Sequence, residues 1–173
     1  QRRTLALPGT ANSAPWRMAV HGLSDLLEEW ISGTRGVAAT RIAYNFGGRI
    51  WLVDSDGANA TPLTPAAVRA LSPSFHPSGQ SVVYSTLEPA GSAIYVTDLR
   101  GASRRVVAPS GLNISPTFTP DGSGIAYAHG EDFGTELFLV GAGGGVPRRI
   151  SIGRGSDNTS PSFSPDGRRI AFT

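Results

Sequence analysis

The sequence predicts a mainly β chain made of repeated four-stranded antiparallel blades, with a helical segment before them. Three observations support this fold class. An eight-residue motif occurs three times at even spacing, apolar strand patterns follow each copy, and Gly and Pro are frequent, at 22 and 13 of 173 residues. Such a composition is typical of many short strands joined by tight turns.

The repeated motif reads Ser-Pro-Ser/Thr-Phe, then a variable residue, then Pro-Asp/Ser-Gly. Its copies are separated by 43 residues from Pro73 to Pro116 and by 45 residues from Pro116 to Pro161. A period of about 40–45 residues is that of one propeller blade. We therefore expect residues 39–173 to form an incomplete β-propeller.

Each copy of the motif predicts the innermost strand of a blade and the turn that follows it. Pro and Gly in Pro-Asp-Gly suit a turn, because Pro restricts φ and Gly adopts a positive φ. The Pro of Ser-Pro lacks an N–H, so we expect it at the start of its strand rather than in the centre. Apolar runs supply second and third strands, as in Ile125-Ala126-Tyr127 and Leu137 to Val140. An earlier second strand, Ile42-Ala43-Tyr44, has no innermost strand before it.

Residues 1–38 differ from the repeats. Apolar residues recur there at helical spacing, and Gly33 is placed to end the helix; they are Trp16, Val20, Leu23, Leu27 and Trp30. Arg2 to Leu7 suits a strand. We interpret this segment as the C-terminal end of an α/β domain. Position 1 is not Met and the last residues follow a strand pattern, so we expect the chain to be part of a longer protein.

Several kinds of chemistry lack a motif. There is no Cys, no nucleophile elbow of the Gly-x-Ser-x-Gly type, and no apolar run of the roughly 20 residues that a membrane span needs. The three His residues have no metal-ligand spacing. Asp54-Ser55-Asp56-Gly57 resembles the start of a calcium loop but lacks the distal ligands, so we expect a turn. The Arg residues are scattered in pairs, which argues against nucleic-acid binding. We expect no cofactor and no metal.

The segments just before the innermost strands are the candidate binding residues. Antiparallel strands alternate direction, so these segments should gather at one mouth of the propeller channel, opposite the Pro-Asp-Gly turns. Their amides, hydroxyls and apolar side chains suit protein recognition, although ordinary inter-blade connections would look similar. They are Arg69, Ala70 and Leu71; Leu112, Asn113 and Ile114; and Ser156, Asp157, Asn158 and Thr159.

A more specific pattern lies at the junction of the two regions. His21-Gly22-Leu23-Ser24-Asp25, Ile31-Ser32-Gly33 and Thr40-Arg41-Ile42-Ala43-Tyr44 resemble the domain junction of the TolB family, periplasmic propeller proteins of the Tol–Pal system. Residues 54–59 and 62–64 resemble the first blade of that family. The resemblance covers nearly the whole chain.

This resemblance implies a six-bladed propeller after an N-terminal α/β domain, in a periplasmic protein that is not an enzyme. The propeller of the family binds the peptidoglycan-associated lipoprotein Pal, its N-terminus communicates with TolA, and the system supports outer-membrane integrity and constriction during cell division. By motif position, Leu112 to Ser115 and Thr159 with its neighbours lie on the segments that face Pal. We expect the TolA-binding N-terminus to lie outside this chain.

Two other interpretations remain open. The propeller domain of a prolyl-oligopeptidase-type serine peptidase has similar repeats and precedes an α/β-hydrolase domain. A propeller scaffold in some other protein is the third possibility, because a fold alone does not define a function. The helix before the first blade favours the TolB family over the peptidase.

Overall fold

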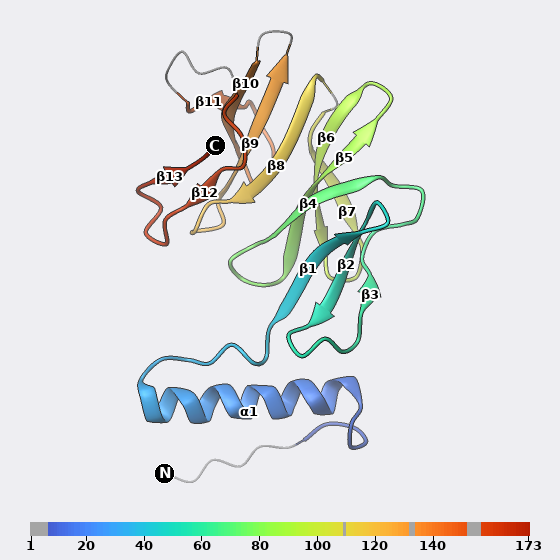
Figure 1. The fold of residues 1–173 in the computed structure, drawn as a ribbon, viewed down its shortest axis with the longest axis vertical. Coiled ribbons are helices and arrows are strands. Elements are labelled where there is room, and N and C mark those ends of the chain that lie inside the picture. Colours follow the sequence, from blue (N-terminus) through green and yellow to red (C-terminus); the bar gives the residue numbers. More distant parts are fainter. Residues whose placement is uncertain (1–6, 109, 132–133, 152–156) are drawn as a thin grey trace. The chain divides into compact units, whose positions relative to one another are not determined.

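The computed structural model describes residues 7–108, 110–131, 134–151 and 157–173 (Figure 1). Most of the strand expected at Arg2 to Leu7 therefore lies outside the described residues. The chain divides into two compact units. The first comprises Gln1–Ile42 and Leu52–Thr61, and the second comprises Ala43–Trp51 and Pro62–Thr173. We call them the helical unit and the blade unit.

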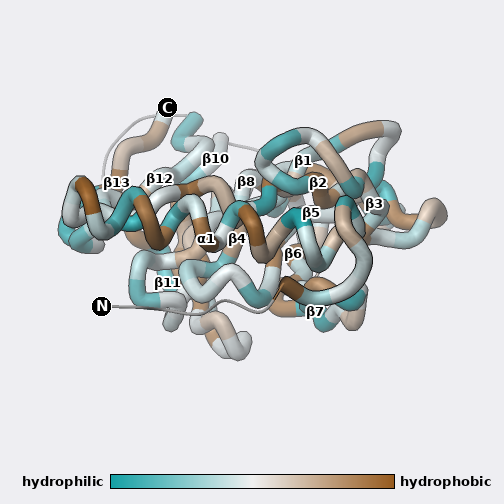
Figure 2. The backbone as a smooth tube through the Cα atoms, turned by 90° about the horizontal axis from the view of Figure 1, so that it is seen from below, coloured by the Kyte–Doolittle hydropathy of each residue, from teal (hydrophilic) through white to brown (hydrophobic). Residues whose placement is uncertain are grey.

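The helix of the helical unit, α1, spans Ala14–Ser32. Pro15 lies in its first turn, where a missing N–H costs nothing. Gly33 ends the helix in the left-handed conformation, with φ of 76°, and its N–H donates to the Glu29 carbonyl at 2.9 Å. The predicted helix and its stop are confirmed, and Figure 2 shows hydrophobic and hydrophilic residues alternating along α1.

The strands form antiparallel sheets in the order of the chain. The first sheet has three strands, β1-β2-β3, and the next two have four each, β4-β5-β6-β7 and β8-β9-β10-β11; β12 and β13 pair as a hairpin. The predicted mainly β fold with four-stranded antiparallel blades is confirmed. The strands are β1 Arg41–Phe46, β2 Arg49–Asp54, β3 Thr61–Pro62, β4 Ala70–Phe75, β5 Ser81–Glu88, β6 Gly91–Asp98, β7 Ser103–Val107, β8 Leu112–Phe118, β9 Gly124–Glu131, β10 Gly134–Gly141, β11 Arg148–Arg149, β12 Ser162–Phe163 and β13 Ile170–Ala171.

The Ser-Pro pair does not begin its strand, and that expectation was wrong. Pro73 and Pro116 lie in the middle of β4 and β8, where the pairing register shifts between Leu71 and Ser74 and between Ile114 and Thr117. Ser72 and Ser115 adopt φ of 50° and 51°. A β-bulge breaks the hydrogen-bonded ladder at this point, so a residue without an N–H is tolerated inside the strand.

The core of the blade unit joins its two complete sheets. The inner strand β8 packs against β4, β5 and β6 of the preceding sheet, and Figure 1 shows the two sheets side by side. One apolar cluster spans the contact, so each blade buries its inner face on its neighbour. Its members are Val83, Ile94, Val96, Val107, Phe118, Ile125, Tyr127 and Val140.

Candidate protein-binding site

The predicted binding segments belong partly to strands, which corrects the expectation that they are connecting loops. β8 already begins at Leu112, because Leu112 pairs with Gly130 and Asn113 pairs with His129 on the near side of the bulge. In the same way, Ala70 is the first residue of β4. The ladder continues past the Ser-Pro bulge, so the innermost strands are longer than their motif suggests.

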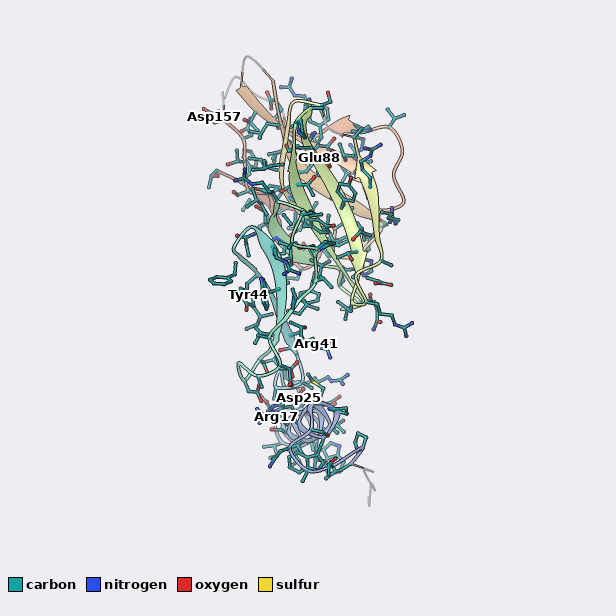
Figure 3. All side chains as sticks on the ribbon, turned by 90° about the vertical axis from the view of Figure 1, so that its right-hand side faces the viewer. Arg17, Asp25, Arg41, Tyr44, Glu88 and Asp157 are labelled. Atoms are coloured by element: carbon teal, nitrogen blue, oxygen red, sulfur yellow. The ribbon has the colours of Figure 1, made fainter. Side chains whose placement is uncertain are left out.

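Strand pairing brings the three segments to one end of the blade unit. The Arg69 carbonyl accepts the Leu87 N–H at 2.9 Å, beside the β5–β6 turn. Leu112 lies opposite Gly130 in β9, and Asp157 forms a parallel bridge with Thr135 in β10. Figure 3 shows Glu88 and Asp157 at the same end of these sheets. We call this end the rim, and residues 69–71, 112–115 and 157–159 the rim segments.

The Pro-Asp-Gly turns lie at the other end of the strands. Phe118 pairs with Ile125, so the turn at 119–122 is a whole strand length away from Leu112. Hydrogen bonds from the Thr119 hydroxyl and from Ser123 lower the pKa of Asp121 to about 2. The rim and the tightly hydrogen-bonded Pro-Asp-Gly turns therefore lie at opposite ends of the strands, as strand alternation predicts.

The rim segments contain exposed and buried members. Arg69, Leu112 and Asp157 are exposed. Ala70 and Asn113 are buried within the chain, at 0% and 1% exposed, so neither presents a side chain to a partner. The remaining members are half-buried, and they are Leu71, Ile114, Ser115, Asn158 and Thr159. Ser156, also predicted as a binding residue, lies outside the described residues.

Asn113 holds the start of β8 in place. Its Nδ2 donates to the carbonyls of Ser92 at 2.7 Å and Ser110 at 2.9 Å, and its backbone N–H donates to the Ser92 hydroxyl. Because its amide nitrogen faces carbonyls, its Oδ1 is the acceptor for His129 Nδ1 at 2.8 Å. The sequence predicted Asn113 as a binding residue and gave His129 no metal-ligand spacing. The structure shows both in one hydrogen-bonded network beneath the rim.

A second network lies under the segment at Asp157 to Thr159. The Asn158 N–H donates to the Thr135 carbonyl at 2.8 Å, and its Nδ2 donates to Glu136 Oε2 at 3.1 Å. Glu136 also accepts a hydrogen bond from the Ser151 hydroxyl. Glu136 and His129 are directly paired across β9 and β10. Glu136 was not among the predicted residues. Its carboxylate stands directly before the apolar strand run at 137–140, and this position was the signal in the sequence that could have identified it.

Clefts lined in part by aromatic side chains open beside both complete blades. One, of about 470 Å³, is lined by Asn113, Tyr127, His129 and Phe138 among others. The other, of about 430 Å³, is lined by Arg69, Tyr84, Glu88 and Tyr95 among others. Burial raises the pKa of Tyr127 to about 12, so this phenol stays neutral at physiological pH. Tyr84 and Tyr127 are buried, whereas Tyr95 and Phe138 are half-buried. Aromatic residues are enriched in protein-binding surfaces.

The motif at Asp54 to Gly57 is a turn, as expected. The Gly57 N–H donates to the Asp54 carbonyl at 2.8 Å. Asp56 accepts the backbone N–H of Ala58 at 2.9 Å, lies 2.7 Å from His21 Nε2, and pairs with Arg17. Among the described residues, no group of three or more His, Asp or Glu side chains is arranged to hold a metal ion.

The repeats match the model of a known protein family. The family model for the TolB β-propeller domain matches residues 28–173, which is most of the chain. The chain belongs to the TolB β-propeller domain family. The recognition made from the junction and blade motifs is therefore confirmed.

Curated relatives carry the same family name. The Tol-Pal system protein TolB of Xylella fastidiosa (strain M12) is 35% identical over 115 residues, covering 62% of this chain and 26% of the relative. That of Hydrogenovibrio crunogenus is 36% identical over 106 residues, covering 56% and 24%. The chain thus spans about a quarter of the length of these TolB proteins.

Solved structures show the fold in TolB and elsewhere. TolB from Acinetobacter baumannii matches with a TM-score of 0.68 at 21% identity, covering 95% of this chain and 54% of that one. The tricorn protease matches with a TM-score of 0.62 at 20% identity, covering 76% and 12%. At such identities the likeness concerns the fold alone. Among the described residues, no helix combines the length and the apolar character that crossing a membrane requires.

Proposed function

We propose that this TolB-like chain binds Pal, the peptidoglycan-associated lipoprotein, through its rim segments. The protein would do so in the periplasm, supporting outer-membrane integrity and invagination during cell division. Contacts with other Tol proteins such as TolA would be made elsewhere in the molecule. Membership of the TolB family supports the assignment to the Tol–Pal system.

The observation that carries this proposal is the meeting of three rim segments at one end of the blade unit. Exposed Arg69 and Asp157 offer charges of both signs, and Leu112, 42% exposed, offers an apolar contact. Asn113 fixes the strand beneath Leu112 through its hydrogen bonds to Ser92 and Ser110. A supported surface loses little conformational entropy on binding, which favours affinity.

Thr159 provides the test. Its N–H and carbonyl pair with Thr173, at 2.7 Å and 3.0 Å, so a substitution of its side chain leaves these backbone bonds possible. In the full-length gene product, we expect Thr159→Arg to weaken binding of the soluble domain of Pal by more than about tenfold, measured by calorimetry, because a charge desolvated without a partner is costly.

The matched control is Ser123→Arg, beside the Pro-Asp-Gly turn at the far end of the strands. It should leave the Pal affinity within about twofold of wild type, as is usual for a surface change away from an interface. Equal losses in the two variants would show that the binding face is wrongly assigned. Unchanged affinity in Thr159→Arg would refute the role of this rim segment.

We also propose that the chain acts by binding and not by catalysis. The alternative is a propeller domain of a prolyl-oligopeptidase-type peptidase. The reading frame distinguishes the two, because such a peptidase would continue into a hydrolase domain with a Gly-x-Ser-x-Gly elbow.

A further inference from the structure

The side chain of Glu136 connects several groups at the start of β10. Oε2 accepts hydrogen bonds from Asn158 Nδ2 at 3.1 Å and from the Ser151 hydroxyl, and Oε1 pairs with Arg149 Nη2 at 2.8 Å. The Glu136 side chain is 23% exposed, against 49% for Arg149. Glu136 is thus a partly shielded carboxylate with three partners from later parts of the chain.

Two of these partners are also anchored to β10 through the backbone. The Leu137 N–H donates to the Ser151 hydroxyl oxygen at 3.0 Å. On the other side, the Asn158 N–H donates to the Thr135 carbonyl at 2.8 Å. Glu136 lies between these two attachment points, so one carboxylate links Ser151 to the rim residue Asn158.

The neighbouring blade lacks this arrangement, although its motif is the same. The position 43 residues before Glu136 is Ala93 in β6. The residue equivalent to Asn158 is Asn113, at the start of the following blade, and it donates to the Ser92 and Ser110 carbonyls. The charged arrangement is therefore not a general requirement of the blade fold. It belongs to the rim segment that contains Thr159.

We propose that Glu136 is a positioning residue, which fixes Asp157, Asn158 and Thr159 in the conformation that binds the partner. Ser151 and Asn158 are oriented by its Oε2, and Arg149 balances its charge. A charge-assisted hydrogen bond is stronger than a neutral one, so the carboxylate holds Asn158 better than an amide would. This inference rests on the binding function proposed above.

The first test measures the segment without any partner. In the full-length gene product, Glu136→Ala should speed hydrogen exchange at the Asn158 and Thr159 amides by about tenfold or more, since local opening becomes easier. Glu136→Gln keeps one acceptor and should give a smaller increase. Glu29→Gln on α1 is the control for loss of one negative charge and should leave both amides unchanged. Unchanged exchange in both Glu136 variants would overturn the proposal.

A double-mutant cycle then tests the specific pair. If Glu136 acts through Asn158, the Glu136→Ala and Asn158→Ala variants should lose affinity for the soluble Pal domain by similar factors, about fivefold or more, and the double variant should lose little more than either one. Fully multiplicative losses would refute the coupling. Faster exchange together with unchanged affinity in every variant, Thr159→Arg included, would leave the conformational role intact and refute the proposed function instead.

Discussion

The helical unit and the blade unit are stabilised by different interactions. In α1, Asp25 is the buried residue among those described, and its carboxylate accepts the N–H groups of Ala38 at 2.6 Å and Ala39 at 2.9 Å. In the blade unit, eight buried apolar side chains and antiparallel ladders form the core. Polar interactions depend on pH and salt, whereas apolar burial depends on shape and volume. The two units should therefore respond to different perturbations.

A close backbone approach shapes the segment after α1 in the helical unit. A Cβ added at Gly36 would come within 2.9 Å of the Asp25 Cα, so only glycine fits this position. The chain can thus turn back over Asp25 and bring the Ala38 and Ala39 N–H groups to its carboxylate. Meanwhile Leu27 and Trp30 remain 46% and 53% exposed. The conformation after α1 is defined by hydrogen bonds to one carboxylate rather than by an apolar core.

The largest effect is expected from a cavity in the blade unit. Ile125 is fully buried between the two complete sheets, so Ile125→Ala should lower the free energy of unfolding by about 2–5 kcal/mol. Leu27→Ala on α1 removes a half-exposed side chain and should cost less than about 1 kcal/mol. Urea denaturation of the full-length gene product measures both values. Similar decreases in the free energy of unfolding for the two variants would show that the units do not differ in their dependence on apolar burial.

A smaller effect is expected from Asp25→Asn. The amide keeps one oxygen acceptor but faces the second backbone N–H with its own NH₂ group, so the free energy of unfolding should fall by about 1–3 kcal/mol. Hydrogen exchange should increase at Ala38 and Ala39 and not in β9. Glu28→Gln, on the same helix but exposed, is the control. Protection that survives at both alanines would contradict the assigned role of Asp25.

The smallest effect concerns pH. The Ala58 N–H, then His21 and Arg17, lower the pKa of Asp56 to about 2. A lowered pKa in the folded state means that Asp56 stabilises the helical unit above its unfolded pKa of about 4, and that this stabilisation is lost as the pH falls toward 2. An NMR titration of the Asp56 carboxyl carbon should have its midpoint near 2, and a midpoint near 4 would refute the contacts of Asp56 with Ala58, His21 and Arg17 together.

Asp121 in the blade unit is the matched control for this titration. Its pKa is also lowered to about 2, but by hydrogen bonds from Thr119 and Ser123. Salt screens exposed charges more strongly than it weakens short hydrogen bonds. Added salt should therefore raise the pKa of Asp56 more than that of Asp121. Equal changes in the two pKa values would mean that charge interactions lower the pKa of Asp56 no more than they lower that of Asp121.

The sequence by itself determined the features that depend on neighbouring residues or on the repeat. The spacing of Pro73, Pro116 and Pro161 located the blades, and Gly33 located the end of α1. The turn at Asp54 to Gly57 was also predictable, because its residue types favour one local conformation. Strand alternation then placed the rim segments and the Pro-Asp-Gly turns at opposite ends.

Only the tertiary structure decided how the rim is supported. β8 continues past the bulge at Ser115 and Pro116, and Asn113 at its start is buried. Strand pairing brings His129 and Glu136 together beneath the rim. Asn113 and His129 are 16 residues apart in the chain, and Glu136 and Asn158 are 22 residues apart. No local pattern specifies such contacts, because they depend on the register of strands that pair only when the blades fold.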